Sequence, residues 1–261
     1  MNYKKISFIF LLFIMLLSSI SLNAQQKYFM RQRTFDKNIK IGIKAGANFA
    51  KTAYSDDRMA DYDHLYKARP MFGASVEIPL TKVLSISPEV LFVGKGAYVE
   101  YLNNDNDKEM YRIKSNYIDL RVPILINIPI NGMNRFYVMF APDLGFNIGG
   151  NMSINSSDIN GGSSQALSIN KDNTALIDFG VLGGLGCRFN IPVTNNFYLV
   201  TRIELGYNHG LIDSYTNGER SGDVQSLNVN NLDVQGTRIN RGIEAAIILS
   251  IPLSKGDAYC P

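Results

Sequence analysis

YIDLRVPILINIPINGMNRFYV, residues 117–138, carries an aliphatic residue at every second position as far as an Asn131-Gly132 pair. Even positions from 118 to 128 are Ile, Leu or Val, whereas odd positions include Asp119, Arg121 and Asn127. Successive side chains of a strand point to opposite faces, so this period predicts a strand with one apolar and one mixed face. Asn-Gly favours the tight turns of hairpins. The stretch therefore predicts two antiparallel strands joined by a short turn.

The same alternation recurs along the chain and predicts eight strands, several longer than the usual 3 to 10 residues. An Ile-Pro pair stands at the end of every second strand, the last being Ile251-Pro252. Proline donates no backbone hydrogen bond, so it suits positions where pairing stops. The expected strands are Ile39–Ala50, Pro70–Leu80, Leu84–Leu102, Tyr111–Pro129, Arg135–Gly150, Thr174–Pro192, Phe197–Ile212 and Thr237–Leu253.

The connections between these strands alternate between short and long. Short turns fall around residues 81–82, 131–132 and 194–195, and the polar connections at 51–69, 103–110, 151–173 and 213–236 are longer. An even strand number with short turns at one end and long loops at the other is typical of outer-membrane barrels. We therefore expect an all-β fold, an eight-stranded antiparallel up-and-down transmembrane β-barrel with both termini in the periplasm.

The N-terminus has the pattern of a secretory signal peptide. Met1–Lys5 is basic, Ile6–Ile20 is almost wholly apolar, and Ala24 is a small residue at the expected cleavage point. A membrane-anchoring helix is the alternative, but such a helix needs roughly 20 apolar residues. The expected organisation is a signal peptide at 1–24, a periplasmic segment at 25–38, the barrel at 39–253 and a tail at 254–261.

The charged face of each strand is expected to line the lumen, and the apolar face to contact lipid. A soluble, lipocalin-like barrel would reverse the two faces, but its exterior would then be sparse in charge and rich in glycine. Acidic and basic residues interleave, which favours a structural network of ion pairs, while a proton or ion path stays open. The predicted lumen residues are Lys44, Glu77, Glu89, Asp119, Arg121, Asp143, Asp178, Arg188, Arg202, Glu204 and Glu244.

Closure into a barrel pairs every backbone polar group, as hydrocarbon requires. Aromatic side chains usually border the apolar band of such barrels. The chain contains no Trp, so Tyr and Phe must supply these girdles. The candidates are Tyr98, Tyr101, Tyr111, Phe136, Tyr137 and Tyr207.

Motifs for catalysis or cofactor binding are weak. His64 and His209 are far apart in the sequence, and the serines show no nucleophile-elbow pattern. The glycines of GVLGGLG, residues 180–186, lie within a strand pattern and open no helix, unlike a phosphate-binding loop. The formal charge of +3 falls to +1 without Lys4 and Lys5, which gives no indication of a nucleic-acid partner. We expect no enzymatic activity, no cofactor and no metal.

Several stretches resemble the PorT-like outer-membrane β-barrel family of Bacteroidetes-type bacteria. They include NYIDLRVPILI at 116–126, RFYVMFAPDLGFNIGG at 135–150 and LVTRIELGYNHGLID at 199–213. The resemblance implies an eight-stranded barrel in the cell outer membrane and a link to protein secretion, the role of the family's namesake. Expected partners are outer-membrane lipid, the barrel assembly machinery and a secretion or surface protein. A small-solute channel and a barrel enzyme acting on lipid remain alternatives.

Overall fold

The computed structural model describes residues 37–54, 63–102, 108–130, 133–155, 163–166, 175–194, 197–214 and 238–253. Every regular element within these ranges is a β-strand. No helix of these ranges is long and apolar enough to cross a membrane. The expected signal peptide, the segment as far as residue 36 and the tail lie outside the described residues.

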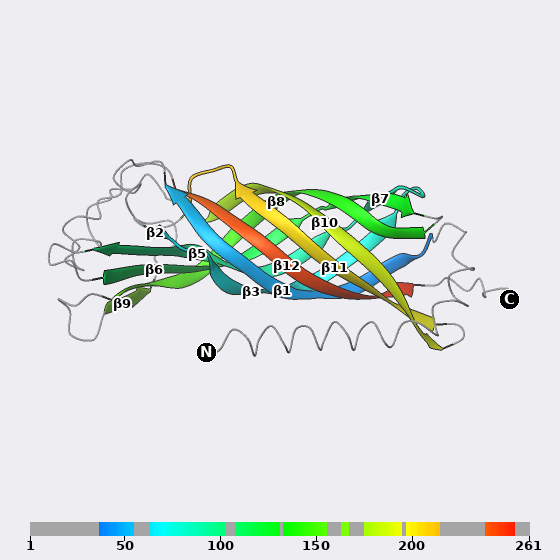
Figure 1. The fold of residues 1–261 in the computed structure, drawn as a ribbon, viewed down its shortest axis with the longest axis horizontal. Coiled ribbons are helices and arrows are strands. Elements are labelled where there is room, and N and C mark those ends of the chain that lie inside the picture. The colour runs from blue at the N-terminus through cyan, green and yellow to red at the C-terminus, as the bar shows by residue number, and fades with distance from the viewer. Residues whose placement is uncertain are drawn as a thin grey trace.

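The strands form one closed antiparallel ring, as the sequence predicts (Figure 1). The ring runs β1, β3, β4 with β5, β6 with β7, β8, β10, β11 and β12, each paired with the next, while β2 and β9 pair only with β5 and β8. β12 returns to β1 through a ladder from Leu253↔Ile39 to Arg238↔Tyr54. Two pairs of consecutive elements, β4 with β5 and β6 with β7, each act as one strand of the ring. The strands are β1 (Ile39–Tyr54), β2 (Asp63–His64), β3 (Lys67–Pro79), β4 (Leu84–Ile86), β5 (Glu89–Leu102), β6 (Lys108–Arg121), β7 (Ile124–Ile130), β8 (Met133–Asn155), β9 (Ser163–Ala166), β10 (Ile177–Thr194), β11 (Phe197–Gly210) and β12 (Arg238–Leu253).

Prolines interrupt two neighbouring strands that the sequence predicts to be continuous. Pro88 separates β4 from β5, and Pro123 separates β6 from β7. A proline cannot donate to the ladder, so the pairing stops there. The backbone N–H of Ser87 donates to the Pro123 carbonyl at 2.8 Å, which keeps the two breaks side by side. The predicted strands Leu84–Leu102 and Tyr111–Pro129 are therefore each two strands.

The two ends of the barrel differ. The long connections lie at the end where β2 pairs with β5 and β9 pairs with β8, two short strands that the sequence analysis did not predict. The opposite end carries β4, β7 and the short turns. Figure 1 places β2, β6 and β9 at one end and β7 at the other. We call these ends the loop side and the turn side.

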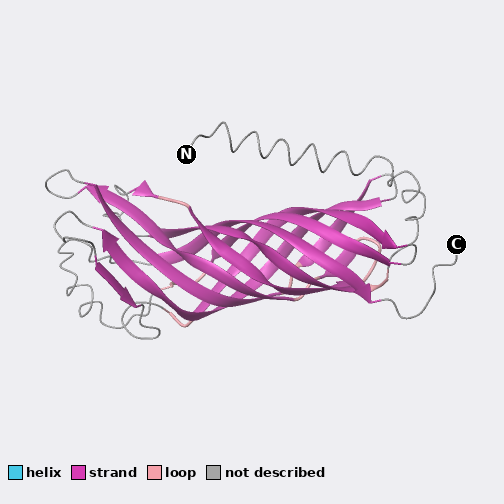
Figure 2. Cartoon of the chain, turned by 90° about the horizontal axis from the view of Figure 1, so that it is seen from below, coloured by secondary structure: helices cyan, strands magenta, loops and turns pink. Residues whose placement is uncertain are grey.

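The outer face of the barrel is an apolar belt, the outward aliphatic and aromatic side chains of the strands. On β12, Ile243, Ile247 and Leu253 are 39–49% exposed, whereas the alternating Glu244 and Ile248 are buried. Ile243 to Leu253 covers ten residue steps of β12, about 33 Å along the strand at roughly 3.3 Å per residue. The strands cross the long axis obliquely (Figure 2). With strands tilted by about 40° from the barrel axis, this length corresponds to an apolar belt about 25 Å tall, as in transmembrane barrels.

Two of the predicted girdle residues are buried. Phe136 and Tyr207 are exposed on the outer face, as a girdle requires, but Tyr98 and Tyr137 are buried. Phe136 and Tyr137 are neighbours in one strand, so strand alternation prevents both from facing lipid. The predicted roles of Tyr98 and Tyr137 are therefore wrong. The side chains of Tyr101 and Tyr111 are outside the described part of the structure.

Glycines of β10 and β11 make room for large side chains inside the ring. A Cβ on Gly186 would collide with the Tyr137 ring, and a Cβ on Gly184 would lie 2.6 Å from Cε of Met139. Tyr137 and Met139 belong to a buried cluster with Leu125, Ala141 and Leu182. The interior is thus filled by side chains, as expected for eight strands.

Candidate functional site: the ionic network of the lumen

The side chains predicted to line the lumen point inward. All are buried except Arg188, which is half-buried. They separate into two groups along the barrel axis. The loop-side cluster comprises Lys95, Asp119, Arg121, Asp143, Asp178 and Glu244, and the turn-side cluster comprises Lys40, Lys44, Glu77, Glu89, Arg188, Arg202 and Glu204.

Arg121 is the centre of the loop-side cluster. Its guanidinium donates to Asp143 from Nε at 3.0 Å, to Glu244 from Nη1 at 2.6 Å and to Asp119 from Nη2 at 2.9 Å. Asp119 is on β6 with Arg121 and Asp143 is on the neighbouring β8, whereas Glu244 is on β12, so the bond to Glu244 crosses the ring. The fork of donors on arginine suits such multiple pairing.

Lys95 is the second cation of this cluster. Its ammonium lies 3.0 Å from Asp178, 3.1 Å from Asp119 and 3.7 Å from Asp143, and 4.7 Å from the centroid of the Tyr117 ring. Four carboxylates therefore share two cations, a formal charge of −2. Two amides add hydrogen bonds: Asn208 donates to Asp143, and Asn240 donates to Asp178 at 3.1 Å.

The turn-side cluster contains more cations than carboxylates. Lys44 bridges Glu89 at 2.9 Å and Glu204 at 2.8 Å. Glu204 also accepts a hydrogen bond from the Tyr137 hydroxyl at 2.7 Å. This hydroxyl explains why a tyrosine is buried here, since a buried O–H needs an acceptor.

Glu77 is the other centre of the turn-side cluster. It accepts from Arg188 at 2.6 Å and Arg202 at 3.4 Å, and Lys40 lies 3.8 Å away. Arg202 also donates to the hydroxyl of Ser87 at 3.2 Å, beside the proline breaks. The four cations and three carboxylates give a formal charge of +1.

Two charged members of the network, Lys40 and Lys95, are not among the lumen residues predicted from the sequence. Both share the inward parity of predicted lumen residues: Lys40 precedes Lys44 by four positions in β1, and Lys95 follows Glu89 by six in β5. Strand parity applied to every charged residue would have found them. It would also have found the buried amides, Asn48, Asn127, Asn147, Asn208 and Asn240.

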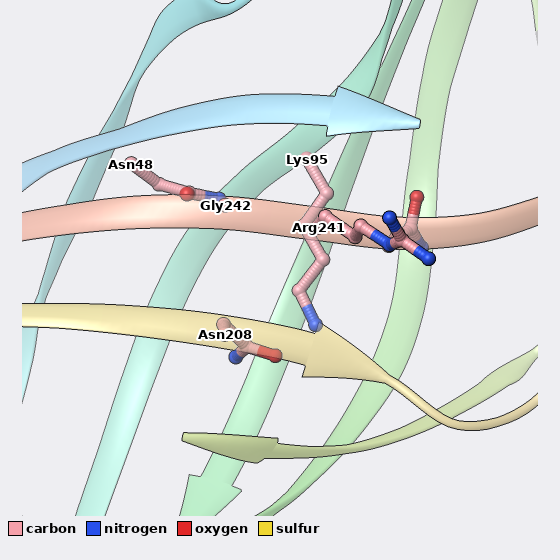
Figure 3. Close-up of a pocket in the computed structure, with 6 residues that line it drawn as sticks. Asn48, Lys95, Asn208, Arg241 and Gly242 are labelled. Carbon is pink, nitrogen blue, oxygen red and sulfur yellow. The ribbon is translucent and has the colours of Figure 1, made fainter. Parts of the chain in front are cut away.

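A small hollow lies on the loop side of Lys95. It is lined by Asn48, Lys95, Asn208, Asn240, Arg241 and Gly242 (Figure 3). Its empty volume of about 200 Å³ includes space open to solvent. Amides and two cations line the hollow, so it is polar enough to hold water.

The charges of the network are paired with one another. Within the described ranges, no three His, Cys, Asp or Glu side chains are grouped so that they could hold a metal ion. His64 belongs to β2 and His209 to β11, strands that do not pair with each other. Buried charges that are paired and hydrogen-bonded hold neighbouring strands in a defined arrangement.

A family model described as "Outer membrane protein beta-barrel domain" matches residues 23–216, most of the chain. The chain belongs to this family. The match ends before β12, whose pairing with β1 closes the ring. The family suggests an outer-membrane location, which agrees with the height of the apolar belt.

Three solved outer-membrane proteins are similar over most of the chain. Neisserial surface protein A is 13% identical, with 81% of this chain and 96% of that chain covered and a TM-score of 0.36. Ail of Yersinia pestis, solved with a heparin analogue, is 10% identical (82% and 99% covered, TM-score 0.33). OprG of Pseudomonas aeruginosa is 9% identical (85% and 96% covered, TM-score 0.35). TM-scores this low support no comparison of individual sites. No curated protein matches the sequence.

Proposed function

We propose that this protein is a non-enzymatic outer-membrane barrel that holds its long loops at the cell surface to bind a partner. The supporting observation is the filled lumen, in which ion pairs cross the ring on both the loop side and the turn side. A barrel so filled serves as a rigid anchor. Activity is then expected at the loops, where binding residues are commonly found on rigid scaffolds.

The orientation follows from the unequal connections. In bacterial barrels, short turns face the periplasm and long loops face outward. The turn side is therefore assigned to the periplasm together with both ends of the chain. The connections 55–62, 103–107, 156–174 and 215–237 would then face the exterior.

The resemblance to PorT-like barrels of Bacteroidetes-type bacteria supports a more specific proposal, in which the protein takes part in protein secretion. In that case the loops would bind a secretion or surface protein. The barrel assembly machinery would insert the chain, as it does for outer-membrane barrels in general.

Loop deletion tests partner binding. Proteins captured on the full-length barrel in intact membranes are compared with those captured after replacement of residues 215–236 by a short Gly-Ser linker. Loss of a captured protein is expected. Deletion of the tail 255–261, at the other end, serves as the control, and an identical set of partners for all three forms would contradict the proposal.

Conductance separates an anchor from a channel. The folded barrel in planar bilayers is expected to show no steady single-channel current, because Arg121 and its partners fill the loop side and Glu77 and its partners fill the turn side. A reproducible open state in the native chain would favour the small-solute channel instead.

A further inference from the structure

Three basic side chains form a row across neighbouring strands on the outer face. His209 of β11 pairs with Arg241 of β12, and Arg241 pairs with Lys51 of β1. Arg241 borders the hollow beside Lys95, but it lies between Asn240 and Gly242, which are buried on the lumen side, so strand alternation directs its side chain outward. All three side chains are half-buried. We call them the basic row.

The basic row interrupts the outward apolar side chains near the loop side, and Leu211 and Ile239 continue the apolar face beyond it. Two residues closer to the turn side, Tyr207 pairs with Ile243 and Ile243 pairs with Phe49. These three side chains are exposed and form the last apolar row before the basic row. Because the belt below has about the height of a hydrocarbon layer, about 25 Å, the basic row is at the level of lipid headgroups.

The protein supplies no counter-charge to this row among the outward positions described around it. The outward neighbours toward the loops are Leu211, Ile239 and Ala53, and those beside the row are Val181 and Tyr66. Like charges on directly opposite strand positions repel each other. An anion from outside the protein would remove this repulsion.

Local contacts position the row for an external acceptor. The Lys51 ammonium lies 5.4 Å from the centroid of the Tyr66 ring, and the His209 and Tyr207 rings are 6.2 Å apart. Among the described residues, the buried Nε donor of Arg241 has no hydrogen-bond partner. A guanidinium matches phosphate oxygens in a bidentate manner.

The same strands carry no such row at the turn side. Their outward residues there are apolar as far as the strand ends: Ile39 and Ile41 of β1, and Ile251 and Leu253 of β12. The difference means that only one membrane surface meets a cluster of basic side chains on these strands.

We infer that the basic row binds the phosphate of a lipid headgroup on the loop-side surface of the membrane. Acyl chains of that lipid pack on Tyr207, Ile243 and Phe49, while its phosphate accepts hydrogen bonds from Arg241, Lys51 and His209. The inference rests on the proposed function only in requiring that the barrel spans a bilayer. It adds a specific ligand chemistry to the outer wall, independent of the loops.

The test compares two lipids bound to the folded full-length barrel by native mass spectrometry. Phosphatidic acid and phosphatidylcholine with identical acyl chains are offered at equal concentrations. The native chain is expected to retain phosphatidic acid preferentially. Arg241→Gln is expected to weaken this retention about tenfold, since a hydrogen bond to a charged group is lost. Arg241→Lys keeps the positive charge but loses the forked donors of the guanidinium. Its retention of phosphatidic acid is expected to lie between that of the native chain and that of Arg241→Gln.

Lys82→Gln is the matched control, because it removes one exposed cation from the turn side. It is expected to leave retention unchanged. Equal retention by Arg241→Gln, Lys51→Gln and Lys82→Gln would overturn the inference. So would displacement of the lipid by inorganic phosphate at the same concentration, which would indicate a site for soluble anions.

Failure of the inference is distinguishable from failure of the proposed function. Reconstitution into phosphatidylcholine vesicles, followed by electrophoresis without heating, reports whether the barrel inserts and closes. A barrel that inserts but shows no preference for phosphatidic acid contradicts only the inference. A chain that does not insert contradicts both.

Discussion

The two halves of the lumen are built on opposite plans. On the loop side, one arginine, Arg121, holds three carboxylates, and negative charge is in excess. On the turn side, one carboxylate, Glu77, holds cations from three strands, and positive charge is in excess. Removing a shared partner leaves several like charges buried together. The free energy of unfolding lost on a substitution is therefore expected to rise with the number of opposite charges that the replaced residue pairs with.

Arg121→Met is expected to have the largest effect. It leaves Asp119, Asp143 and Glu244 without their common cation, and breaking a buried pair costs about 3–5 kcal/mol. The measurement is the fraction of compact, unheated barrel on electrophoresis as a function of urea concentration. An unchanged unfolding midpoint would show that the loop-side cluster does not depend on Arg121.

Lys44→Met tests the turn side in the same way. Glu89 and Glu204 lose a shared cation, but Glu204 keeps the hydroxyl of Tyr137 and faces Arg202 at 3.9 Å. The expected destabilisation is therefore at the lower end of the range for a broken buried pair, about 3 kcal/mol. The same urea titration measures it. A cost larger than that of Arg121→Met would reverse the comparison.

Gly186→Ala is expected to destabilise the turn side by about 2–3 kcal/mol, because overpacking forces the Tyr137 ring away from Glu204. Gly183→Ala is the control on the same strand, since a Cβ at Gly183 meets no atom within 4 Å. Urea midpoints of the two variants are compared. Equal midpoints would mean that the interior has more room than the packing of Tyr137 implies.

Tyr137→Phe is expected to have the smallest effect, about 1.5 kcal/mol, from loss of one hydrogen bond to a charged acceptor. Tyr207→Phe removes a hydroxyl from the outer face and is expected to leave the urea midpoint nearly unchanged. A similar loss for both variants would indicate that the bond between Tyr137 and Glu204 contributes little.

Strand alternation predicted the barrel and its two faces well. The run from Tyr117 to Pro129 places Asp119 and Arg121 inward and Ile126 outward, as the period of two requires. The same rule, applied more strictly, would have placed Tyr137 inside. It would also have added Lys95 to the lumen. The prolines at 88 and 123 carried a readable signal for the strand breaks, because each removes a donor from the ladder.

The ion pairs within the lumen could not be predicted from local sequence patterns. Arg121 meets Glu244 across 123 positions of sequence, and Lys44 meets Glu204 across 160. Such contacts depend on ring closure and on the register between strands. The basic row has the same origin, since Lys51, Arg241 and His209 come together only through the ladders of β12.

The closing ladder between β1 and β12 has a consequence for biogenesis. The first and last strands of the ring are partners along their whole length, so the seam cannot form until the final strand has been made and delivered. A chain that ends before Arg238 would leave two strands, β1 and β11, with unpaired backbone groups facing hydrocarbon. A chain truncated before β12 is therefore expected not to close into a barrel.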